Sequence, residues 1–270
     1  MDHLLKNLTG IERTNDLSRP WIPENKRPTF FHGLHEFIRG RHRDIEIVEV
    51  MITLFTLDEM KNVRVVYTRK TDTFVELDRR GQIANEQGGK LFISIHCNSL
   101  EHKPSSTRGF EVYLLRPGRT EEAISIAERE NAVIKMEPGY EKRYKELTEE
   151  NFILVAMAQS AYVKASEQFA DILQNAMGRE TGIPNSGVKQ AGFYVLVGAA
   201  MPNVLVETAY LSNRQEERFL KSESGQQKIA ESIFRAIKRY KTEYEKVLQE
   251  GKDIGEAPSL TSPEEGAPAR

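Results

Sequence analysis

The chain has 270 residues, of which 39% are hydrophobic and 29% are charged, and its formal net charge is -2. A chain of this length and composition can bury a core and form one large α/β domain or two small ones. The small net charge gives no reason to expect nucleic acid or an anionic membrane surface as a partner. The single cysteine, Cys97, excludes an intrachain disulfide framework and any metal site that needs several cysteines.

The two ends of the chain differ in composition from the part between them. Residues 1–28 are polar and interrupted by prolines, so we expect a poorly ordered arm. Residues 251–270 are rich in Gly, Pro, Ser and Glu and are expected to form a disordered tail. The first residues lack the apolar run of a secretory signal peptide, and no segment is apolar for long enough to cross a membrane. We therefore expect one folded domain over residues 29–250.

Within that domain, short apolar runs alternate with helical patterns. Strands are predicted at residues 63–68, 91–95, 109–115 and 203–207. A helix is predicted from Leu77 to near Gly88. The last predicted helix has Ser224 and Gln227 as a capping box, followed by apolar residues at helical spacing. This alternation predicts an α/β fold with a mostly parallel sheet flanked by helices.

A long, mainly helical stretch separates the third and fourth predicted strands. It runs from about residue 120 to 177. A simple crossover helix needs far fewer residues, so we expect a helical insertion there, forming a subdomain or a lid.

Two polar residues end apolar strands and are candidates for chemistry. His96 directly follows the run 91–95, where a metal-ligating imidazole would stand in an α/β sheet. Glu207 follows three aliphatic residues, and a buried carboxylate is costly unless it is paired, coordinated or catalytic. The alternatives are a half-buried histidine bonded to a loop and a carboxylate that caps the next helix. Together the two residues suggest metal-assisted hydrolysis.

Several ordered blocks resemble one known family. They lie at residues 65–72, 77–85, 91–99, 109–113, 187–196 and 202–213. From about residue 63 to 240 the sequence resembles the catalytic domain of N-acetylmuramoyl-L-alanine amidases of the family-3, division-amidase type. The resemblance implies a hydrolase that cuts the amide between muramic acid and L-alanine in peptidoglycan during cell-wall remodelling and daughter-cell separation.

The resemblance also implies a catalytic centre with one Zn²⁺ held by two histidines and a glutamate. The family's second histidine ligand corresponds to His96. Its catalytic glutamate corresponds to Glu207, which would take a proton from the zinc-bound water that attacks the amide. The block 187–196 borders the family's substrate groove. Contacts to the stem peptide are therefore expected from Lys189, Gln190, Ala191 and Gly192.

The family's first zinc ligands have no clear counterpart near the front of this chain. His32 is the candidate for the first histidine ligand, and Glu46 follows it at about the family's spacing for the glutamate ligand. His35 and His42 compete with them. The same stretch is compatible with a front end that no longer encodes a zinc site. The alternative function is therefore an inactive amidase-like domain that binds peptidoglycan or a partner.

The insertion has a counterpart in the family as well. In division amidases such a segment includes a helix that covers the zinc site until an activator protein displaces it. Glu128 and Glu130 are the candidate zinc-blocking carboxylates here, and the alternative is a solvated helical pair. Because the substrate is cell wall, a periplasmic or secreted location is expected.

Overall fold

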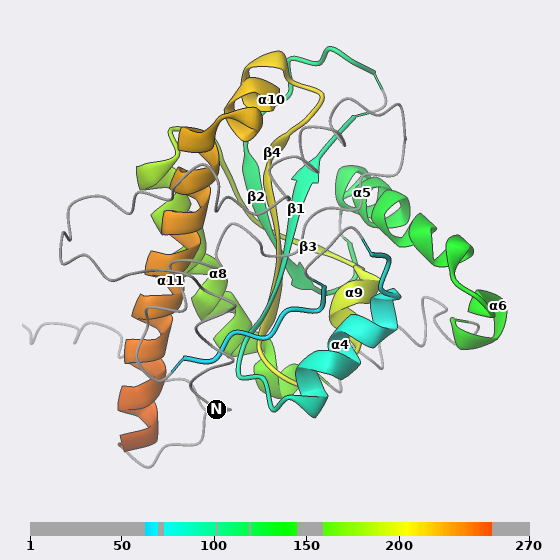
Figure 1. Ribbon diagram of the computed structural model, residues 1–270, viewed down its shortest axis with the longest axis vertical. Coiled ribbons are helices and arrows are strands. Elements are labelled where there is room, and N and C mark those ends of the chain that lie inside the picture. The colour runs from blue at the N-terminus through cyan, green and yellow to red at the C-terminus, as the bar shows by residue number, and fades with distance from the viewer. Residues whose placement is uncertain (1–62, 70–72, 101, 119, 145–158, 250–270) are drawn as a thin grey trace, which may run out of the picture. The chain divides into compact units, whose positions relative to one another are not determined.

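The computed structural model describes residues 63–69, 73–100, 102–118, 120–144 and 159–249 (Figure 1). All of them belong to the compact unit Arg41–Arg270. The predicted arm, the predicted tail and the candidate ligands His32, His35, His42 and Glu46 lie outside these residues.

The described strands form one sheet. They are β1 (Phe92–Asn98), β2 (Phe110–Leu115), β3 (Asn185–Ala191) and β4 (Asn203–Tyr210), in the order β1-β4-β2-β3. β1 is parallel to β4 and β2 is parallel to β3, whereas the central β2–β4 pair is antiparallel. The prediction of an α/β fold with a mostly parallel sheet is confirmed.

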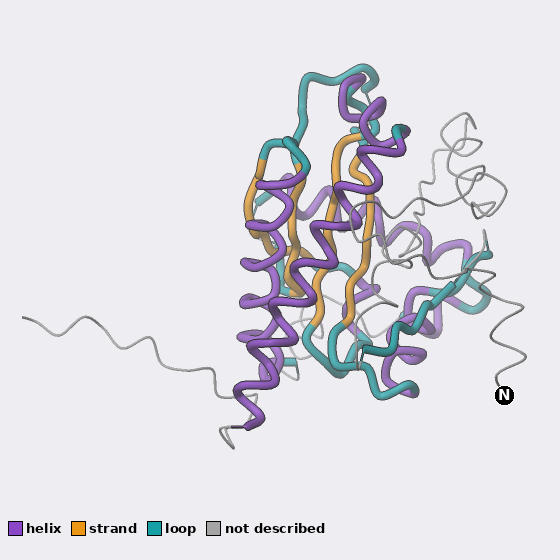
Figure 2. Tube along the Cα trace, turned by 60° about the vertical axis from the view of Figure 1, so that its left-hand side comes forward, coloured by secondary structure: helices purple, strands orange, loops and turns teal. Residues whose placement is uncertain are grey.

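Helices cover both faces of this sheet (Figure 2). They are α4 (Leu77–Glu86), α5 (Glu121–Asn131), α6 (Tyr140–Arg143), α8 (Ser160–Glu180), α9 (Tyr194–Val197), α10 (Arg214–Lys221) and α11 (Glu223–Gln249), with a 3₁₀ turn at Ala132–Met136. α8 packs on β2, β3 and β4, and α11 packs on α8. On the other face, residues of α4, α5 and α9 join strand residues in one buried cluster.

The helical stretch 120–177 divides into two parts with different roles. α8 presents Phe169, Leu173 and Met177, all without exposed surface, at a spacing of four residues. This apolar stripe makes α8 a layer of the fold and not a part of an inserted subdomain. The insertion as described is therefore the segment with α5 and α6, which leads into the undescribed residues 145–158.

Two local predictions differ from the structure. Residues 63–69 form no strand. This is so even though β1 is an edge strand of the described sheet, with β4 as its one hydrogen-bonded neighbour there. The cap of α11 is Ser222 and not Ser224, because the Gly225 N–H donates to Ser222 Oγ at 3.0 Å. Both serines fit a capping pattern, but Ser222 is the residue that lies between the end of α10 and the start of α11.

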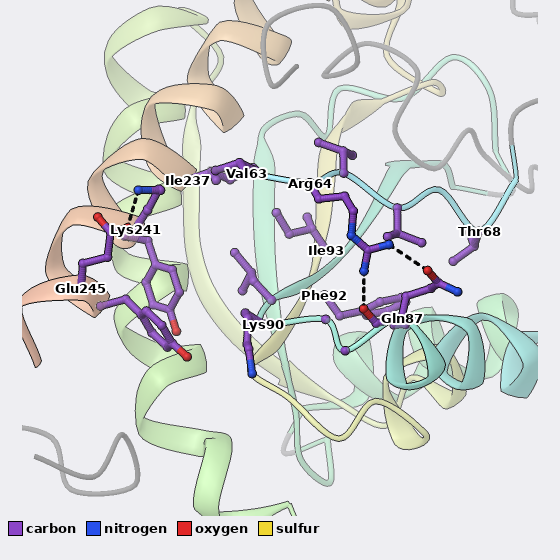
Figure 3. Close-up of a pocket in the computed structure, with 18 residues that line it drawn as sticks. Val63, Arg64, Thr68, Gln87, Lys90, Phe92, Ile93, Ile237, Lys241 and Glu245 are labelled. Atoms are coloured by element: carbon purple, nitrogen blue, oxygen red, sulfur yellow. Dashed lines mark hydrogen bonds and ion pairs between the residues drawn. The ribbon is translucent and has the colours of Figure 1, made fainter. Parts of the chain in front are cut away.

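A cavity of about 450 Å³ lies between the segment from Val63 to Thr68, the loop after α4, the start of β1 and the second half of α11 (Figure 3). Arg64 at its rim donates to the Gln87 side-chain oxygen at 2.8 Å. Among the described residues, no helix combines the length and apolar character that crossing a membrane requires.

Candidate active site

Three polar side chains share one level of the sheet. In the strand register, His96 of β1 lies opposite Glu207 of β4, and Glu207 lies opposite Glu111 of β2. Directly opposed residues point to the same face of a sheet, so all three project toward the side that carries α4, α5 and α9. Two separate apolar strands therefore bring the predicted pair, His96 and Glu207, together.

Glu207 is a buried carboxylate without a partner. It has no exposed surface, and neither carboxylate oxygen has a hydrogen-bond partner among the described residues. Burial, and then the neighbouring charge of Glu130, raises the pKa of Glu207 to about 8. Because a buried orphan carboxylate is costly, its place in the fold points to a ligand or a reaction that uses it.

Both ring nitrogens of His96 are engaged. Nε2 lies 3.0 Å from Ser94 Oγ on the same strand, and Nδ1 lies 3.2 Å from Glu130 Oε2 of α5. Burial opposes ionisation of Glu130, but the adjacent His96 and Arg129 lower its pKa below the usual range. Glu130 is thus an anion held against the imidazole, and Nδ1 is the ring nitrogen on the side of the carboxylates.

The donor set at this place fits a zinc ion. His96, Glu130 and Glu207 each offer one atom, and these atoms lie within 4.8 Å of one another. Imidazole nitrogen and carboxylate oxygen are ligands that zinc accepts. The two unpartnered oxygens of Glu207 are what a cation or a polarised water would satisfy. These three residues thus form a candidate metal site, while the other predicted ligands, His32 and Glu46, lie outside the described residues.

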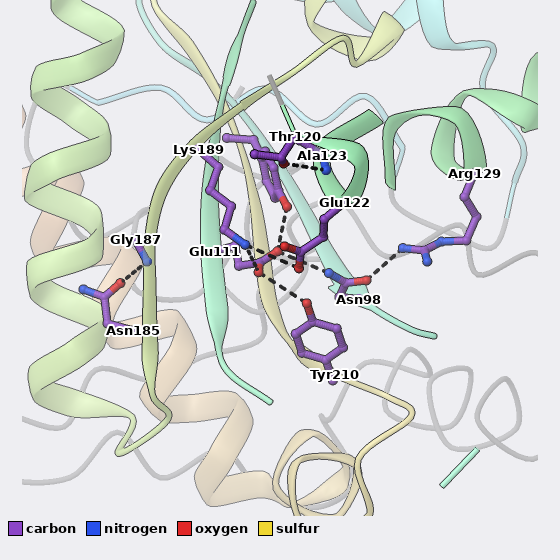
Figure 4. A network of polar contacts seen from close by, with 11 residues as sticks. Asn98, Glu111, Thr120, Glu122, Ala123, Arg129, Asn185, Gly187, Lys189 and Tyr210 are labelled. Atoms are coloured by element: carbon purple, nitrogen blue, oxygen red, sulfur yellow. Dashed lines mark hydrogen bonds and ion pairs between the residues drawn. The ribbon is translucent and has the colours of Figure 1, made fainter. Parts of the chain in front are cut away.

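Glu111 completes the row and is fully engaged (Figure 4). It accepts hydrogen bonds from Lys189 Nζ at 2.6 Å and from the Tyr113 hydroxyl at 2.7 Å. The Tyr210 hydroxyl and the Asn98 amide nitrogen each donate from 3.3 Å. Glu111 is not among the residues predicted from the sequence, although its position as a charged residue inside the apolar run 109–115 was a usable signal.

α5 is fixed over this network by polar contacts along its length. The Glu122 carboxylate lies 3.6 Å from Lys189 Nζ near the start of the helix. Arg129 donates to the Asn98 side-chain oxygen at 2.8 Å. Glu130 follows with its contact to His96, described above. These contacts hold α5 against the face of the sheet that carries His96, Glu207 and Glu111.

The predicted lid and substrate residues occupy different positions. Of the two candidate blocking carboxylates, Glu130 contacts His96, whereas Glu128 is exposed. Lys189 bonds Glu111, so it lies on the face of the candidate site, and Gly192 offers its carbonyl oxygen to α5. Ala191 is fully buried, which leaves only its backbone for a ligand.

Gln190 alternates with Lys189 and points to the opposite face of β3. Its side-chain oxygen is buried without a hydrogen-bond partner among the described residues. The structure therefore separates this side chain from His96 and Glu207. A contact of Gln190 with a substrate remains a prediction.

The comparisons with known proteins agree on one family. Residues 49–239 match the family model described as N-acetylmuramoyl-L-alanine amidase. The chain is 34% identical over 208 residues to the N-acetylmuramoyl-L-alanine amidase AmiC of Escherichia coli, covering 75% of this chain and 48% of the relative. It is 32% identical over 186 residues to AmiC of Neisseria meningitidis, covering 67% and 43%. The chain spans about half the length of these two relatives.

Among solved structures, the catalytic domain of CwlV, the N-acetylmuramoyl-L-alanine amidase from Bacillus (Paenibacillus) polymyxa, superposes with a TM-score of 0.50 at 26% identity. The match covers 71% of this chain and 81% of that domain. The matched residues 49–239 include His96, Glu207 and Glu111. These three residues come from three different strands and lie opposite one another in the sheet. On this evidence the chain belongs to the N-acetylmuramoyl-L-alanine amidase family.

Proposed function

We propose that this chain is a zinc-dependent hydrolase that cleaves the amide bond between N-acetylmuramic acid and L-alanine in peptidoglycan. The observation that carries the proposal is the orphan carboxylate of Glu207, buried beside the imidazole of His96. Family membership supplies the reaction class. The paired strands supply a base and a metal ligand at one place.

In this proposal His96 would hold the zinc ion through Nδ1, and His32 and Glu46 would be the remaining ligands. When bound, zinc supplies a Lewis acid that lowers the pKa of water and polarises the amide carbonyl. Lys189 and the backbone from Lys189 to Gly192 line the approach of the stem peptide.

Glu207 moves the proton. In its ionised form it accepts a proton from the attacking water, and it then delivers that proton to the nitrogen of L-alanine as the amide bond breaks. A general base works best when its pKa lies near the working pH. Burial brings the pKa of Glu207 to about 8 in the metal-free protein, and a nearby cation would lower it again.

α5 is the proposed regulatory lid. Its Glu130 occupies the nitrogen of His96 that a metal would need, so the described arrangement is a closed one. An activator protein that displaces α5 would remove Glu130 from the site. Since the substrate is peptidoglycan, we place the protein in the periplasm or outside the cell, in daughter-cell separation.

The proposal is tested by replacing Glu207 with glutamine. Glu207→Gln keeps the size of the side chain but cannot accept the proton, so hydrolysis should fall by about 10²-fold or more while zinc content is retained. The measurements are release of stem peptide from purified peptidoglycan and elemental analysis of zinc. Glu217→Gln serves as control, because this partly exposed glutamate of α10 pairs with Lys221 and lies outside the row of strand residues. Substantial hydrolysis by Glu207→Gln would exclude its role as the base.

An inactive amidase-like domain is the second candidate, because the first zinc ligands depart from the family's pattern. In that case the wild-type chain binds peptidoglycan in a sedimentation assay but releases no stem peptide after zinc reconstitution. Stem-peptide release and sedimentation, measured together on the wild-type chain, therefore separate the two candidates.

A further inference from the structure

The side-chain amide of Asn98 links the strand network to α5. Asn98 is the last residue of β1 and has no exposed surface. Its Nδ2 donates to Glu111 Oε2 at 3.3 Å, and its Oδ1 accepts from Arg129 Nη2 at 2.8 Å (Figure 4). A carboxylate accepts and a guanidinium donates, so the two partners fix which end of the amide faces which element. The carbonyl end of Asn98 is therefore directed at α5.

Asn98 stands at the end of β1 where ligands collect in α/β sheets. It lies two residues beyond His96, toward the carboxyl ends of the parallel pair β1 and β4. The register of this pair shifts between the two residues, so that Asn98 pairs with Tyr210 and not with Ala209. Irregularities of this kind are common beside active sites, where they redirect a side chain. Two strand residues cover about 6.6 Å, which places Asn98 within the reach of a substrate group bound beside His96.

The partner of the Asn98 carbonyl belongs to the proposed lid. Arg129 immediately precedes Glu130, which contacts His96, and the Arg129 side chain is 33% exposed. One end of α5 thus covers two groups of β1 at once, the imidazole with an anion and the amide oxygen with an N–H donor. Displacement of α5 would leave the amide oxygen without this partner, whereas Glu111 in the sheet would still hold the other end of the amide. Because an unsatisfied buried acceptor is costly, this oxygen would then favour a new donor.

Asn203 is a second buried asparagine on the same strand pair, but its contacts are structural. It lies at the opposite end of the pair, where it stands opposite Phe92. Its Nδ2 donates to the Met201 carbonyl oxygen at 2.9 Å and to Gln159 Oε1 at 3.1 Å. Gln159 directly precedes α8, which packs on the sheet. Asn203 therefore serves as a matched control for Asn98.

We propose that Asn98 is a substrate-binding residue, whose side-chain oxygen accepts the N–H of the amide that is cleaved once α5 has left the site. Arg129 occupies this oxygen in the closed arrangement. The inference rests on the proposed function and adds to it the group that orients the reacting amide. In a planar trans amide the carbonyl oxygen and the N–H point to opposite sides, so an acceptor for the N–H has to lie beyond the group that engages the carbonyl. Asn98, two residues past His96, meets this condition.

The test measures binding to an opened variant, Arg129→Ala/Glu130→Ala, as the full chain in buffer with chelator so that no turnover occurs. The probes are N-acetylmuramoyl-L-alanyl-D-isoglutamine and an analogue with L-lactate in place of L-alanine, in which an ester replaces the amide that is cleaved. The ester has a similar shape but no N–H to donate. Both probes are titrated by calorimetry against the opened variant, and against the same variant with Asn98→Ala or Asn203→Ala added.

The opened variant should bind the amide probe about fivefold more tightly than the ester, because the ester lacks one hydrogen bond. Asn98→Ala should remove this preference, and Asn203→Ala should keep it. The comparison cancels any intrinsic difference between an amide and an ester. Equal binding of the two probes to the opened variant, a preference that survives Asn98→Ala, or no binding of either probe would each overturn the assignment.

A second measurement leaves Asn98 in place and so does not depend on the folding of Asn98→Ala. In nitrogen-15 NMR spectra of the opened variant, the side-chain amide signal of Asn98 should shift clearly more with the amide probe than with the ester at saturation. Equal shifts would argue that the N–H of the probe does not reach Asn98. Release of stem peptide from peptidoglycan by the zinc-loaded wild type reports separately on the proposed function.

Discussion

The imidazole of His96 lies between a hydroxyl and a carboxylate, and each fixes one nitrogen. Ser94 has no exposed surface, so its hydroxyl has little freedom to turn elsewhere. If Nδ1 ligated a metal, Nε2–H would donate to Ser94 Oγ, and this contact would hold the ring in place. Such partners of a metal-bound histidine typically contribute 10- to 100-fold in metal affinity.

Replacing Ser94 should therefore weaken zinc binding without unfolding the protein. We expect Ser94→Ala to lower zinc affinity about tenfold, measured by competition with a chromophoric chelator. Ser232→Ala is the control, because Ser232 is equally buried but donates within α11 to the Lys228 carbonyl. Equal zinc affinity in Ser94→Ala and wild type would remove the hydroxyl from the metal site.

The titration of Glu207 predicts how stability depends on pH in the metal-free protein. Burial raises the pKa of this carboxyl from an ordinary 4.5 to about 8, so the native state holds the proton more tightly than the unfolded state. Its contribution to the free energy of unfolding is fully present below about pH 4.5 and is lost progressively as the pH rises from there to about 8. The charged groups that face it are His96, Glu111, Glu130 and Arg129.

Glu207→Gln cannot ionise and should escape this loss. We expect the melting temperature of Glu207→Gln, relative to that of the wild type, to rise between about pH 5 and pH 8 and then to level off, in buffer with chelator. Thermal unfolding followed by circular dichroism measures it. Melting curves that stay parallel over this range would mean that the carboxyl ionises without cost in the folded chain.

At the scale of elements, the proposed lid function of α5 depends on one residue, Glu130, which contacts His96. Glu130→Ala removes the anion from His96 and should raise basal hydrolysis of peptidoglycan several-fold, because an open lid no longer needs displacement. Glu128→Ala is the matched control, since that side chain is exposed on the same helix. Unchanged hydrolysis in Glu130→Ala, with zinc content intact, would leave α5 as a structural helix only.

Elements were predictable where burial dominates. The runs that became β1 and β4 are continuous apolar sequences, and the period of α11 is regular. The segment 63–68 has the same β-branched character but forms no strand among the described residues, because a strand also needs a partner. α8 was assigned to an insertion since chain order alone does not show which helix packs on the sheet.

At the scale of the whole molecule, the sequence predicts two residues of the candidate site, His96 and Glu207, each at the end of an apolar run. The other strand residue of the site, Glu111, is not predicted. His96 and Glu207 follow apolar runs, which is a local signal. Glu111 reaches the same level only through the antiparallel β2–β4 register, which no local pattern encodes. Glu130 was one of two candidates, and the rotation of α5 distinguishes them.

The remaining ligands define the last prediction. We expect about one zinc ion per chain after reconstitution, and His32→Ala or Glu46→Gln should each reduce that content strongly, because a catalytic site needs about three protein ligands. Elemental analysis measures it, with His35→Ala and His42→Ala as comparisons. If those two variants lose zinc while His32→Ala keeps it, the assignment of the first ligand is wrong.

The two carboxylates that lie side by side on β2 and β4 differ in their hydrogen bonding. Glu111 accepts hydrogen bonds from Lys189 and two tyrosines, whereas the oxygens of Glu207 have no partner among the described residues. Among these strand residues, an arriving cation finds one uncommitted carboxylate next to one imidazole. Ca²⁺ demands about six or more oxygen ligands, whereas zinc accepts a mixed nitrogen and oxygen set. In the proposed zinc site, the ammonium group of Lys189 would thus keep Glu111 from serving as a further oxygen ligand, without being a ligand itself.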